Sequence, residues 1–335
     1  MSDHNALFRR FPVLEGRIPW LRLGEWPTPV ARIDRLPDGF EGELWVKYDD
    51  RSSPRYGGNK VRKLEYLLAD ARERGAGRII TTGVVGSHHC LATAVHARAV
   101  DLPVTLVVFP QPDTPHARQL TALNEAWADE VRRCSSPATQ PFAEAAVRWR
   151  RRSERPYVVP GGGSNALGTL GYVTGALELA EQVEAGALPR PDTITVAAGT
   201  LGTLAGLAIG AALTNLTDRI VGIRIVPVTI GNTVVLARLV EGAVRLLEEA
   251  GIRIPDPRFV LDRVQLVGDW IGAGYGSPTT WGDDATAWFH DQGLHLDPSY
   301  TAKTAAGLLA RLPADREGVH LYWHTLSATL PGTPD

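Results

Sequence analysis

The residue of this sequence best placed for covalent chemistry is a lysine that follows two glycines. Lys60 ends the run Gly57-Gly58-Asn59-Lys60 and immediately precedes an amphipathic helical pattern, so we expect it near a helix N-terminus. Because that end of a helix is electropositive, a lysine placed there only as a cap would be at the unfavourable end. Desolvation or a neighbouring positive charge lowers the pKa of a lysine and leaves more free amine to attack an aldehyde. Lys60 therefore fits a Schiff-base lysine, and the alternative is a surface lysine beside Arg62 and Lys63.

A second glycine-rich run has the composition of a phosphate-binding loop. It lies between a predicted buried strand and a predicted helix, and it comprises Ala198, Gly199, Thr200, Leu201, Gly202 and Thr203. Backbone N–H groups and the helix dipole form an anion site at such a turn. The spacing does not match the dinucleotide fingerprint and the P-loop lysine is missing, so NAD and ATP are disfavoured. A small phosphate fits this loop, and close packing of the strand on the helix is the alternative.

A third loop, from Gly83 to His89, also lies at the predicted end of a strand and opens a helix. Its N–H groups and the Ser87 hydroxyl are suited to a substrate carboxylate, although ordinary N-capping also explains Ser87 and the two roles are compatible. A metal site is another interpretation, because His88, His89 and Cys90 are of residue types that bind metals. However, adjacent residues on a helix point in different directions, and no second ligand pair has standard spacing. We therefore expect no metal site.

Four further polar residues are candidate site residues only when they are considered together. Tyr300 and Thr301 follow Asp297-Pro298 at a predicted helix start, Thr325 ends the last apolar strand, and Tyr275 lies in the glycine-rich run GAGYGSP. A purely structural role, for example as a loop anchor, also explains each of them.

The composition is that of a globular protein whose small net charge does not favour binding to a highly charged partner. The chain has 335 residues, of which 44% are hydrophobic and 21% charged, and its length permits two or three domains. A net charge of −2 gives no reason to bind nucleic acid or an anionic membrane. The uncharged stretch 193–217 is better explained by a strand, a glycine turn and a helix than by a membrane span. With two cysteines and no signal-peptide-like stretch at the start, we expect a reducing cytoplasm.

Short apolar or β-branched runs alternate with helical patterns, which predicts an α/β fold with a largely parallel sheet. The expected strands cover residues 43–49, 78–83, 103–109, 193–199, 220–228 and 319–325. The expected helices cover residues 61–75, 116–128, 167–182 and 232–251, together with the stretches after Ser87 and Gly202. Ligands of open α/β sheets collect at the carboxyl ends of strands, which directs attention to the loops after residues 83, 199 and 325.

These motifs, in this order and separation, resemble the family of 1-aminocyclopropane-1-carboxylate deaminase and D-cysteine desulfhydrase, which are pyridoxal-phosphate enzymes of the tryptophan-synthase-β fold. The resemblance runs from WPTPV through YGGNKVRKLEYLLADA, TTGVVGSHH, PGGGSNALGTLGYVTGALELAEQ, AAGTLGTLAG and LDPSYTAKTAAGLLARL to YWHT. It implies a two-lobed protein with pyridoxal 5'-phosphate in the cleft between the lobes. Residues 1–60 and 166–335 would form a large cofactor-binding domain, and residues 61–165 a small inserted domain. A homodimer and a small amino-acid substrate are also implied.

The resemblance further implies roles for individual residues. Lys60 would hold the cofactor as a Schiff base and take the α-proton as general base, and the backbone of 199–203 would hold the phosphate. The implied catalytic residues are Lys60, Ser87, Tyr275 and Tyr300. The implied cofactor-binding residues are Asn59, Lys60, His88, Gly199, Thr200, Leu201, Gly202, Thr203, Thr301 and Thr325. The implied substrate-binding residues are Ser87, His88, His89, Tyr275 and Tyr300.

Two of these positions bear on the reaction. The deaminase carries Glu and Leu where this sequence has Thr301 and Thr325, whereas desulfhydrase-like members carry Thr. A carboxylate beside the ring nitrogen would favour a strong electron sink, while a hydroxyl leaves the ring closer to neutral. We therefore expect β-elimination from a small amino acid such as D-cysteine, which gives an oxo acid and ammonia.

Two departures from the family pattern leave alternatives open. Gly86-Ser87-His88 replaces Gln-Ser-Asn, which puts a titratable imidazole beside the cofactor, and Leu326-Ser327 replaces Gly-Gly. The alternatives are a β- or γ-replacement or a cyclisation in specialised metabolism, deamination of 1-aminocyclopropane-1-carboxylate, and a catalytically silent cofactor-binding homologue.

Overall fold

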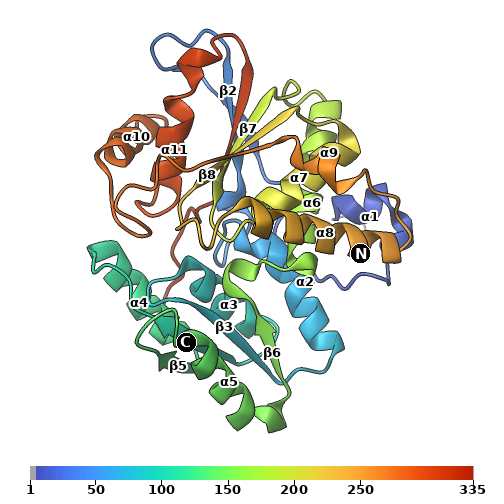
Figure 1. The fold of residues 1–335 in the computed structure, drawn as a ribbon, viewed down its shortest axis with the longest axis vertical. Helices are drawn as coiled ribbons and strands as arrows, with labels where there is room; N and C mark the ends of the chain where they lie inside the picture. The colour runs from blue at the N-terminus through green and yellow to red at the C-terminus, as the bar shows by residue number, and fades with distance from the viewer. Residues whose placement is uncertain (1–4, 335) are drawn as a thin grey trace.

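Two β-sheets organise the chain, and helices cover both faces of each sheet (Figure 1). The computed structural model describes residues 5–334. The large sheet has the strand order β1-β2-β10-β7-β8-β9, and the small sheet has the order β5-β4-β3-β6. Neighbouring strands are parallel, except that β1 and β2 are antiparallel. The expected α/β class is therefore confirmed.

The strands of the two sheets come from separate stretches of the chain. The large sheet comprises β1 (Val30–Ile33), β2 (Glu43–Tyr48), β7 (Thr193–Ala198), β8 (Arg219–Arg224), β9 (Val264–Val267) and β10 (Val319–His324). The small sheet comprises β3 (Arg78–Val84), β4 (Val104–Phe109), β5 (Glu130–Arg133) and β6 (Pro156–Val159).

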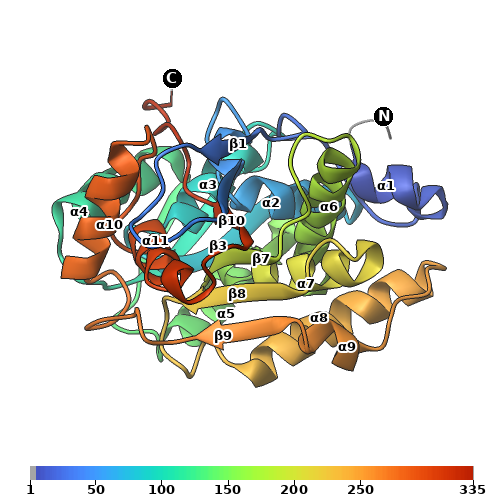
Figure 2. The same cartoon turned by 90° about the horizontal axis from the view of Figure 1, so that it is seen from above.

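The two faces of the large sheet bury different helices, because successive side chains of a strand point to opposite faces. On β10, Leu321 and Trp323 belong to one core and Tyr322 to another. The first core includes side chains of α1 (Ala6–Arg10), α6 (Ala166–Glu184), α7 (Gly202–Thr214), α8 (Thr233–Glu249) and α9 (Pro257–Leu261). The second includes side chains of α10 (Thr280–His290) and α11 (Thr301–Leu309). Figure 2 shows these two groups of helices on opposite sides of the strands.

The small sheet has the same layered arrangement. Its main core includes side chains of α2 (Lys60–Glu73), α3 (His88–Arg98) and α4 (Pro115–Trp127), and Ile79 of β3 points into it. The neighbouring Ile80 points to the opposite face, where Val147 of α5 (Gln140–Arg150) covers it.

The sheets are connected by packing as well as by the chain. Helix α2 contacts α6 beside the large sheet and α3 beside the small one. The Trp127 indole of α4 donates a hydrogen bond to the Gly332 carbonyl at 2.7 Å, so the end of the chain returns to the small sheet. The division at residues 61 and 165 stays a prediction. None of the helices described between residues 5 and 334 is long and apolar enough to cross a membrane.

The six strands expected from the sequence are all present, whereas β1, β5, β6 and β9 were missed. Each missed strand has four residues and lies at an edge of its sheet. An edge strand needs fewer apolar residues than a central one, and four residues are too few to show an alternating pattern. Helices α1, α5, α9 and α10 were also missed, and only the start of α11 was expected.

A buried ionic cluster joins α2 to the large sheet. Arg62 donates to both oxygens of Asp49 at 3.0 and 2.8 Å and to both oxygens of Glu178 at 3.0 and 2.9 Å. Lys47 Nζ donates to Glu178 Oε1 at 2.6 Å. None of these four side chains is more than 3% exposed. Two cations therefore face two carboxylates, and the cluster is electrically neutral.

Neutral donors complete the hydrogen bonding of this cluster. Asp49 Oδ2 accepts hydrogen bonds from the Tyr172 hydroxyl at 2.6 Å and the Trp323 indole at 2.8 Å, and the Thr28 hydroxyl donates to Asp49 Oδ1 at 2.9 Å. Buried charges are tolerated only when they are paired and fully hydrogen-bonded. The cluster therefore fixes α2, α6, β2 and β10 relative to one another.

Replacing Arg62 with methionine should lower the free energy of unfolding by about 3–5 kcal/mol, because two buried carboxylates would then share one cation. Urea unfolding followed by tryptophan fluorescence measures the change. The control is Asp218→Asn, which removes an exposed pair with Arg190 and should cost less than about 1 kcal/mol. Equal losses in the two variants would contradict the structural role of the cluster.

Candidate active site

The loop between β2 and α2 places Lys60 at the carboxyl ends of the central strands. Gly58 has φ +88°, and a Cβ there would lie 2.8 Å from the Thr325 carbonyl oxygen, so this position requires glycine. The Asn59 N–H donates to the same carbonyl at 3.1 Å. Because β2 and β10 are parallel neighbours, the loops that follow them meet at one edge of the sheet. Lys60 begins α2 at this edge.

The amine of Lys60 has no carboxylate partner in the part of the chain that the structure describes. Its Nζ donates to Asn59 Oδ1 at 2.6 Å and lies 6.0 Å from the centroid of the Tyr300 ring. Burial lowers the pKa of Lys60 from 10.5 to about 8, with a smaller opposing effect from the charge of Asp297. A substantial fraction of the amine is therefore neutral and nucleophilic near physiological pH.

The glycine-rich loop after β7 forms a turn into the N-terminus of α7. Leu201 has the left-handed φ of +67°, and α7 starts at the next residue. The Gly202 N–H donates to Ser164 Oγ at 3.3 Å, and Ser164 Oγ lies 2.7 Å from Thr200 Oγ1. The first N–H groups of a helix have no partner within the helix, so this turn presents donors and a positive dipole end.

Lys63 is a residue of this site that the sequence interpretation treated only as a neighbour of Lys60. Its Nζ donates to the Gly162 carbonyl at 3.1 Å and to Ser164 Oγ at 3.2 Å, beside the loop after β7. Its pKa is lowered well below the ordinary value, first by burial and then by the charge of Lys60. The signal in the sequence was the i, i+3 spacing of the two lysines, which puts them on one face of α2. A buried amine whose hydrogen bonds go to neutral oxygens, next to a helix N-terminus, fits a phosphate group, whose charge would favour the protonated amine.

The three loops enclose a cavity of about 340 Å³. Its lining includes these residues expected in the site: Asn59, Lys60, Ser87, His89, Gly199, Thr200, Thr203, Tyr275 and Tyr300. A smaller cavity of about 30 Å³ is also lined by Lys60, and its other lining residues include His88, Tyr300, Thr301 and Thr325. A wider surface groove of about 1080 Å³ beside α5 contains none of the expected residues.

Two of the expected cofactor residues line neither cavity. The Leu201 side chain is 2% exposed and belongs to the large core, and Gly202 lies behind the loop against Ser164. Both residues offer only backbone to a ligand. His89 is also more restricted than expected, because its Nε2 lies 2.9 Å from the Thr81 hydroxyl.

The two tyrosines expected to face the reacting carbons lie against each other. Their hydroxyl oxygens are 2.5 Å apart, and their rings meet edge to face with centroids 5.5 Å apart. Burial raises the pKa of both Tyr275 and Tyr300, so both phenols stay protonated at neutral pH. Across the cavity, Ser87 caps α3 by accepting a hydrogen bond from the Cys90 N–H at 3.3 Å.

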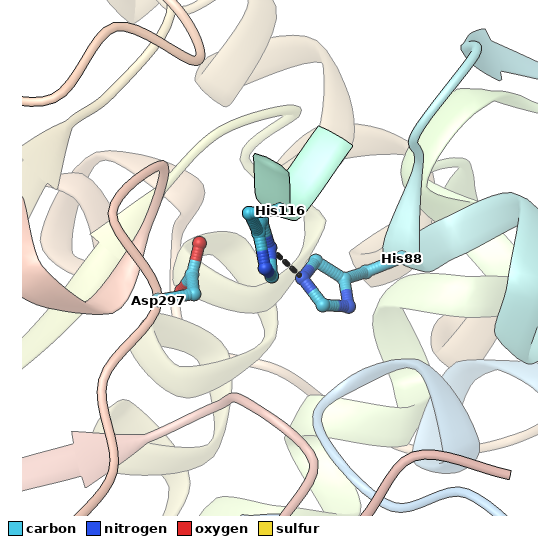
Figure 3. Close-up of side chains that lie close together, drawn as sticks. All are labelled: His88, His116 and Asp297. Atoms are coloured by element: carbon cyan, nitrogen blue, oxygen red, sulfur yellow. Dashed lines mark hydrogen bonds between the residues drawn. The ribbon is translucent and has the colours of Figure 1, made fainter. Parts of the chain in front are cut away.

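His88 is surrounded by residues that the sequence did not associate with it. Its Nδ1 lies 2.5 Å from the Tyr56 hydroxyl, and its Nε2 lies 3.1 Å from His116 Nε2. Figure 3 shows His116 between His88 and Asp297. Burial is the main reason that the pKa of His88 is lowered to about 4, so its imidazole is neutral at physiological pH. Tyr56, His116 and Asp297 come from three different parts of the chain, and no spacing in the sequence links them.

The two threonines have different environments. Thr301 is 1% exposed, and its hydroxyl donates to Asp297 Oδ1 at 2.7 Å, so its orientation is fixed. Thr325 follows β10, and its carbonyl accepts the hydrogen bond from Asn59 described above. Both lie beside Lys60 in the smaller cavity.

Comparisons with known proteins agree with the expected fold and cofactor. A family model described as pyridoxal-phosphate dependent enzyme matches residues 21–325. The chain is 36% identical over 323 residues to a D-cysteine desulfhydrase of Klebsiella pneumoniae (strain 342). It is 34% identical over 328 residues to a D-cysteine desulfhydrase of Salmonella paratyphi B (strain ATCC BAA-1250 / SPB7). Each alignment covers 92% of this chain and 94% of the relative.

Solved structures give the same result. A homologue of ACC deaminase superposes with a TM-score of 0.80 at 31% identity, and the match covers 94% of each chain. An O-ureido-L-serine synthase superposes with a TM-score of 0.60 at 17% identity over 90% of this chain and 88% of that one. The second likeness concerns the fold alone.

The reaction of Lys60 with added pyridoxal 5'-phosphate should accelerate with pH in the cofactor-free protein. The neutral amine is the reacting form, so a pKa of about 8 predicts a rise of about tenfold per pH unit below pH 8 and a plateau above it. Stopped-flow growth of the visible absorption band measures the rate, and Lys60→Ala should give no band. A rate that continues to rise towards pH 10.5, the ordinary lysine value, would contradict the lowered pKa.

Proposed function

This chain belongs to the family of pyridoxal-phosphate dependent enzymes, and we propose that it eliminates the β-thiol of D-cysteine or of a related β-substituted amino acid. D-Cysteine and water would give hydrogen sulfide, ammonia and a three-carbon oxo acid. The observation that carries the proposal is the likeness to D-cysteine desulfhydrases along nearly the whole chain. The threonines at 301 and 325, which desulfhydrase-like members also carry, support the same reaction.

The cofactor end of the site is assigned to three groups. Bound pyridoxal phosphate supplies an aldehyde that combines with amines and a ring that withdraws electrons from Cα. The N–H groups of residues 199–203 and the Lys63 amine hold its phosphate. The Lys60 amine would hold the aldehyde, and as a free amine it would serve as the general base for the Cα proton. A pKa of about 8 suits a general base that works near neutral pH.

The substrate end is assigned to the loop after β3 and to the tyrosine pair. Ser87 and the N-terminus of α3 bind the substrate carboxylate, since both offer hydrogen bonds and the helix dipole favours an anion. Tyr275 and Tyr300 keep their phenolic protons, and their shared hydrogen bond fixes both hydroxyls in the lining of the larger cavity, where they would face the reacting carbons. Asn59 orients the Lys60 amine through its side-chain oxygen.

The threonines favour elimination over opening of a cyclopropane ring. A neutral hydroxyl at 301 would not hold a proton on the ring nitrogen as a carboxylate would, so the cofactor would be a weaker electron sink. Removal of an α-proton followed by loss of a β-substituent needs less electron withdrawal than opening a ring that has no α-proton.

We also propose a cytoplasmic homodimer with the lobe boundaries expected from the sequence. Cys90 and Cys134 are free thiols, which is compatible with a reducing compartment. Sedimentation velocity tests the dimer, and a monomer at micromolar concentration would contradict it.

Purified holoenzyme should release sulfide, ammonia and oxo acid from D-cysteine in equal amounts. Lys60→Ala should lower kcat/KM by about 10²–10⁴-fold, because it removes the general base as well as the covalent attachment. Coupled assays for the oxo acid and colorimetric assays for sulfide measure the product amounts and kcat/KM. A higher kcat/KM for ammonia release from 1-aminocyclopropane-1-carboxylate than from D-cysteine would contradict the proposal.

Ser87→Ala should raise KM for the amino acid by about tenfold or more, since a hydrogen bond to a charged group contributes about 1.5–3 kcal/mol. The same change removes an N-cap, which costs about 0.5–2 kcal/mol of stability. Asn232→Ala is the matched control, because Asn232 caps α8 by accepting from the Val235 N–H at 3.0 Å, outside both cavities. The control should lose similar stability and keep its KM. An unchanged KM in Ser87→Ala would rule out the carboxylate role.

A further inference from the structure

His88, His116 and Asp297 form a cluster with the composition of a metal site (Figure 3). Each offers one ligand atom, and these atoms all lie within 4.8 Å of one another. His88 is the first residue of α3, His116 is the second residue of α4, and Asp297 precedes α11. The expectation of no metal site rested on the adjacent His88, His89 and Cys90, which point in different directions on one helix. In the structure the partners of His88 come from elsewhere in the chain.

The two imidazoles face each other with the atoms that bind metals. The 3.1 Å between His88 Nε2 and His116 Nε2 is close to the separation of two ligands that share one tetrahedral zinc ion. The other nitrogen of His88 lies 2.5 Å from the Tyr56 hydroxyl oxygen, to which a protonated Nδ1 can donate. A partner of this kind fixes the tautomer and the ring orientation of a metal-binding histidine.

Asp297 supplies a buried negative charge that is held in place. Its carboxylate accepts hydrogen bonds from the N–H groups of Ser299, Tyr300 and Thr301 and from the Thr301 hydroxyl, at 2.7 to 3.0 Å. The side chain is 2% exposed, and within residues 5–334 it forms no ion pair with a lysine or arginine. A buried carboxylate without a cationic partner favours a nearby cation.

We propose that His88, His116 and Asp297 bind a zinc-class divalent cation with an open coordination position. Two imidazoles and one carboxylate, with a fourth position left free, are the ligand set of catalytic zinc sites. Ligand atoms of one tetrahedral zinc ion lie about 3.4 Å apart, so a cluster whose atoms lie within 4.8 Å of one another needs side-chain adjustments of about 1.5 Å or less to close around the ion. The cation adds to the cofactor chemistry and does not replace it.

Two of the three ligands border the reaction space. His88 and Asp297 line the same small cavity as Lys60 and Tyr300, so a ligand of the ion would lie beside the reactive amine. A thiolate is a strong zinc ligand. The choice of a thiol as the fourth ligand rests on the proposed function, whereas the metal site itself does not.

Metal content tests the site without reference to activity. Holoenzyme that is loaded with Zn²⁺ and dialysed against metal-free buffer should retain one ion per chain, as measured by mass spectrometry of the metal. His116→Ala should weaken Zn²⁺ binding by more than about 100-fold, and Tyr56→Phe by about 10–100-fold, since even outer-sphere partners contribute that much. Retention of the cofactor absorption band shows that each variant is folded.

The matched control is His295→Ala. His290 and His295 are an exposed pair with ring centroids 5.7 Å apart, so they represent adventitious binding by surface histidines. This variant should keep the wild-type Zn²⁺ content. Wild-type protein that retains no zinc, or His116→Ala with wild-type content, would overturn the proposal.

A non-reacting thiol tests the open position. 3-Mercaptopropionate has the β-thiol and carboxylate of cysteine but no amine, so it cannot combine with the cofactor. Calorimetry should show at least about tenfold tighter binding to zinc-loaded than to zinc-free holoenzyme, because a zinc–thiolate bond is added. Equal affinities would exclude the open position, while D-cysteine turnover would separately report on the proposed function.

Discussion

The neutral ionic cluster around Arg62 is the constraint on which the position of the reactive amine depends. Arg62 lies two residues after Lys60, so the carboxylates that hold its guanidinium also hold the first turn of α2. Asp49 directly follows β2, and Glu178 lies on α6, so elements from three parts of the chain meet in one buried site. The free-energy cost of transferring these charges out of water is offset by their ion pairs and hydrogen bonds only when all partners are present. The loop from Asp49 to Lys60 is therefore fixed at both ends before any ligand arrives.

The first turn of α2 carries three basic side chains in two kinds of environment. Arg62 points to carboxylates, whereas the hydrogen bonds of Lys60 and Lys63 go to neutral oxygens. Burial lowers the pKa of both lysines, and the positive end of a helix acts in the same direction. Two ammonium groups are unfavourable in such an environment, and either the deprotonation of one amine or the binding of an anion stabilises it. A phosphate-bearing aldehyde does both, because it converts one amine into a covalent bond and supplies a dianion to the other.

The sequence predicts the central strands and the loops that follow them, because long apolar runs and glycine-rich turns are local signals. It therefore places Lys60 and the loop after β7 at one edge of the sheet before the structure is known. Residues that act through tertiary contacts carry no such signal. His116 is an ordinary polar residue at the start of a helix, and Tyr56 precedes a glycine loop, yet both contact His88. The short edge strands were missed for a related reason, since their pairing depends on a neighbour and not on their own pattern.

The two departures from the family pattern alter the same cavity. His88, Leu326 and Ser327 all belong to its lining. The Ser327 hydroxyl accepts a hydrogen bond from the Gly57 N–H at 2.8 Å and donates to the Thr329 carbonyl at 2.7 Å, so the added side chain supports the glycine loop before Lys60. Since both departures lie in the cavity beside Lys60, the features that set this chain apart from the family pattern surround the reactive amine itself.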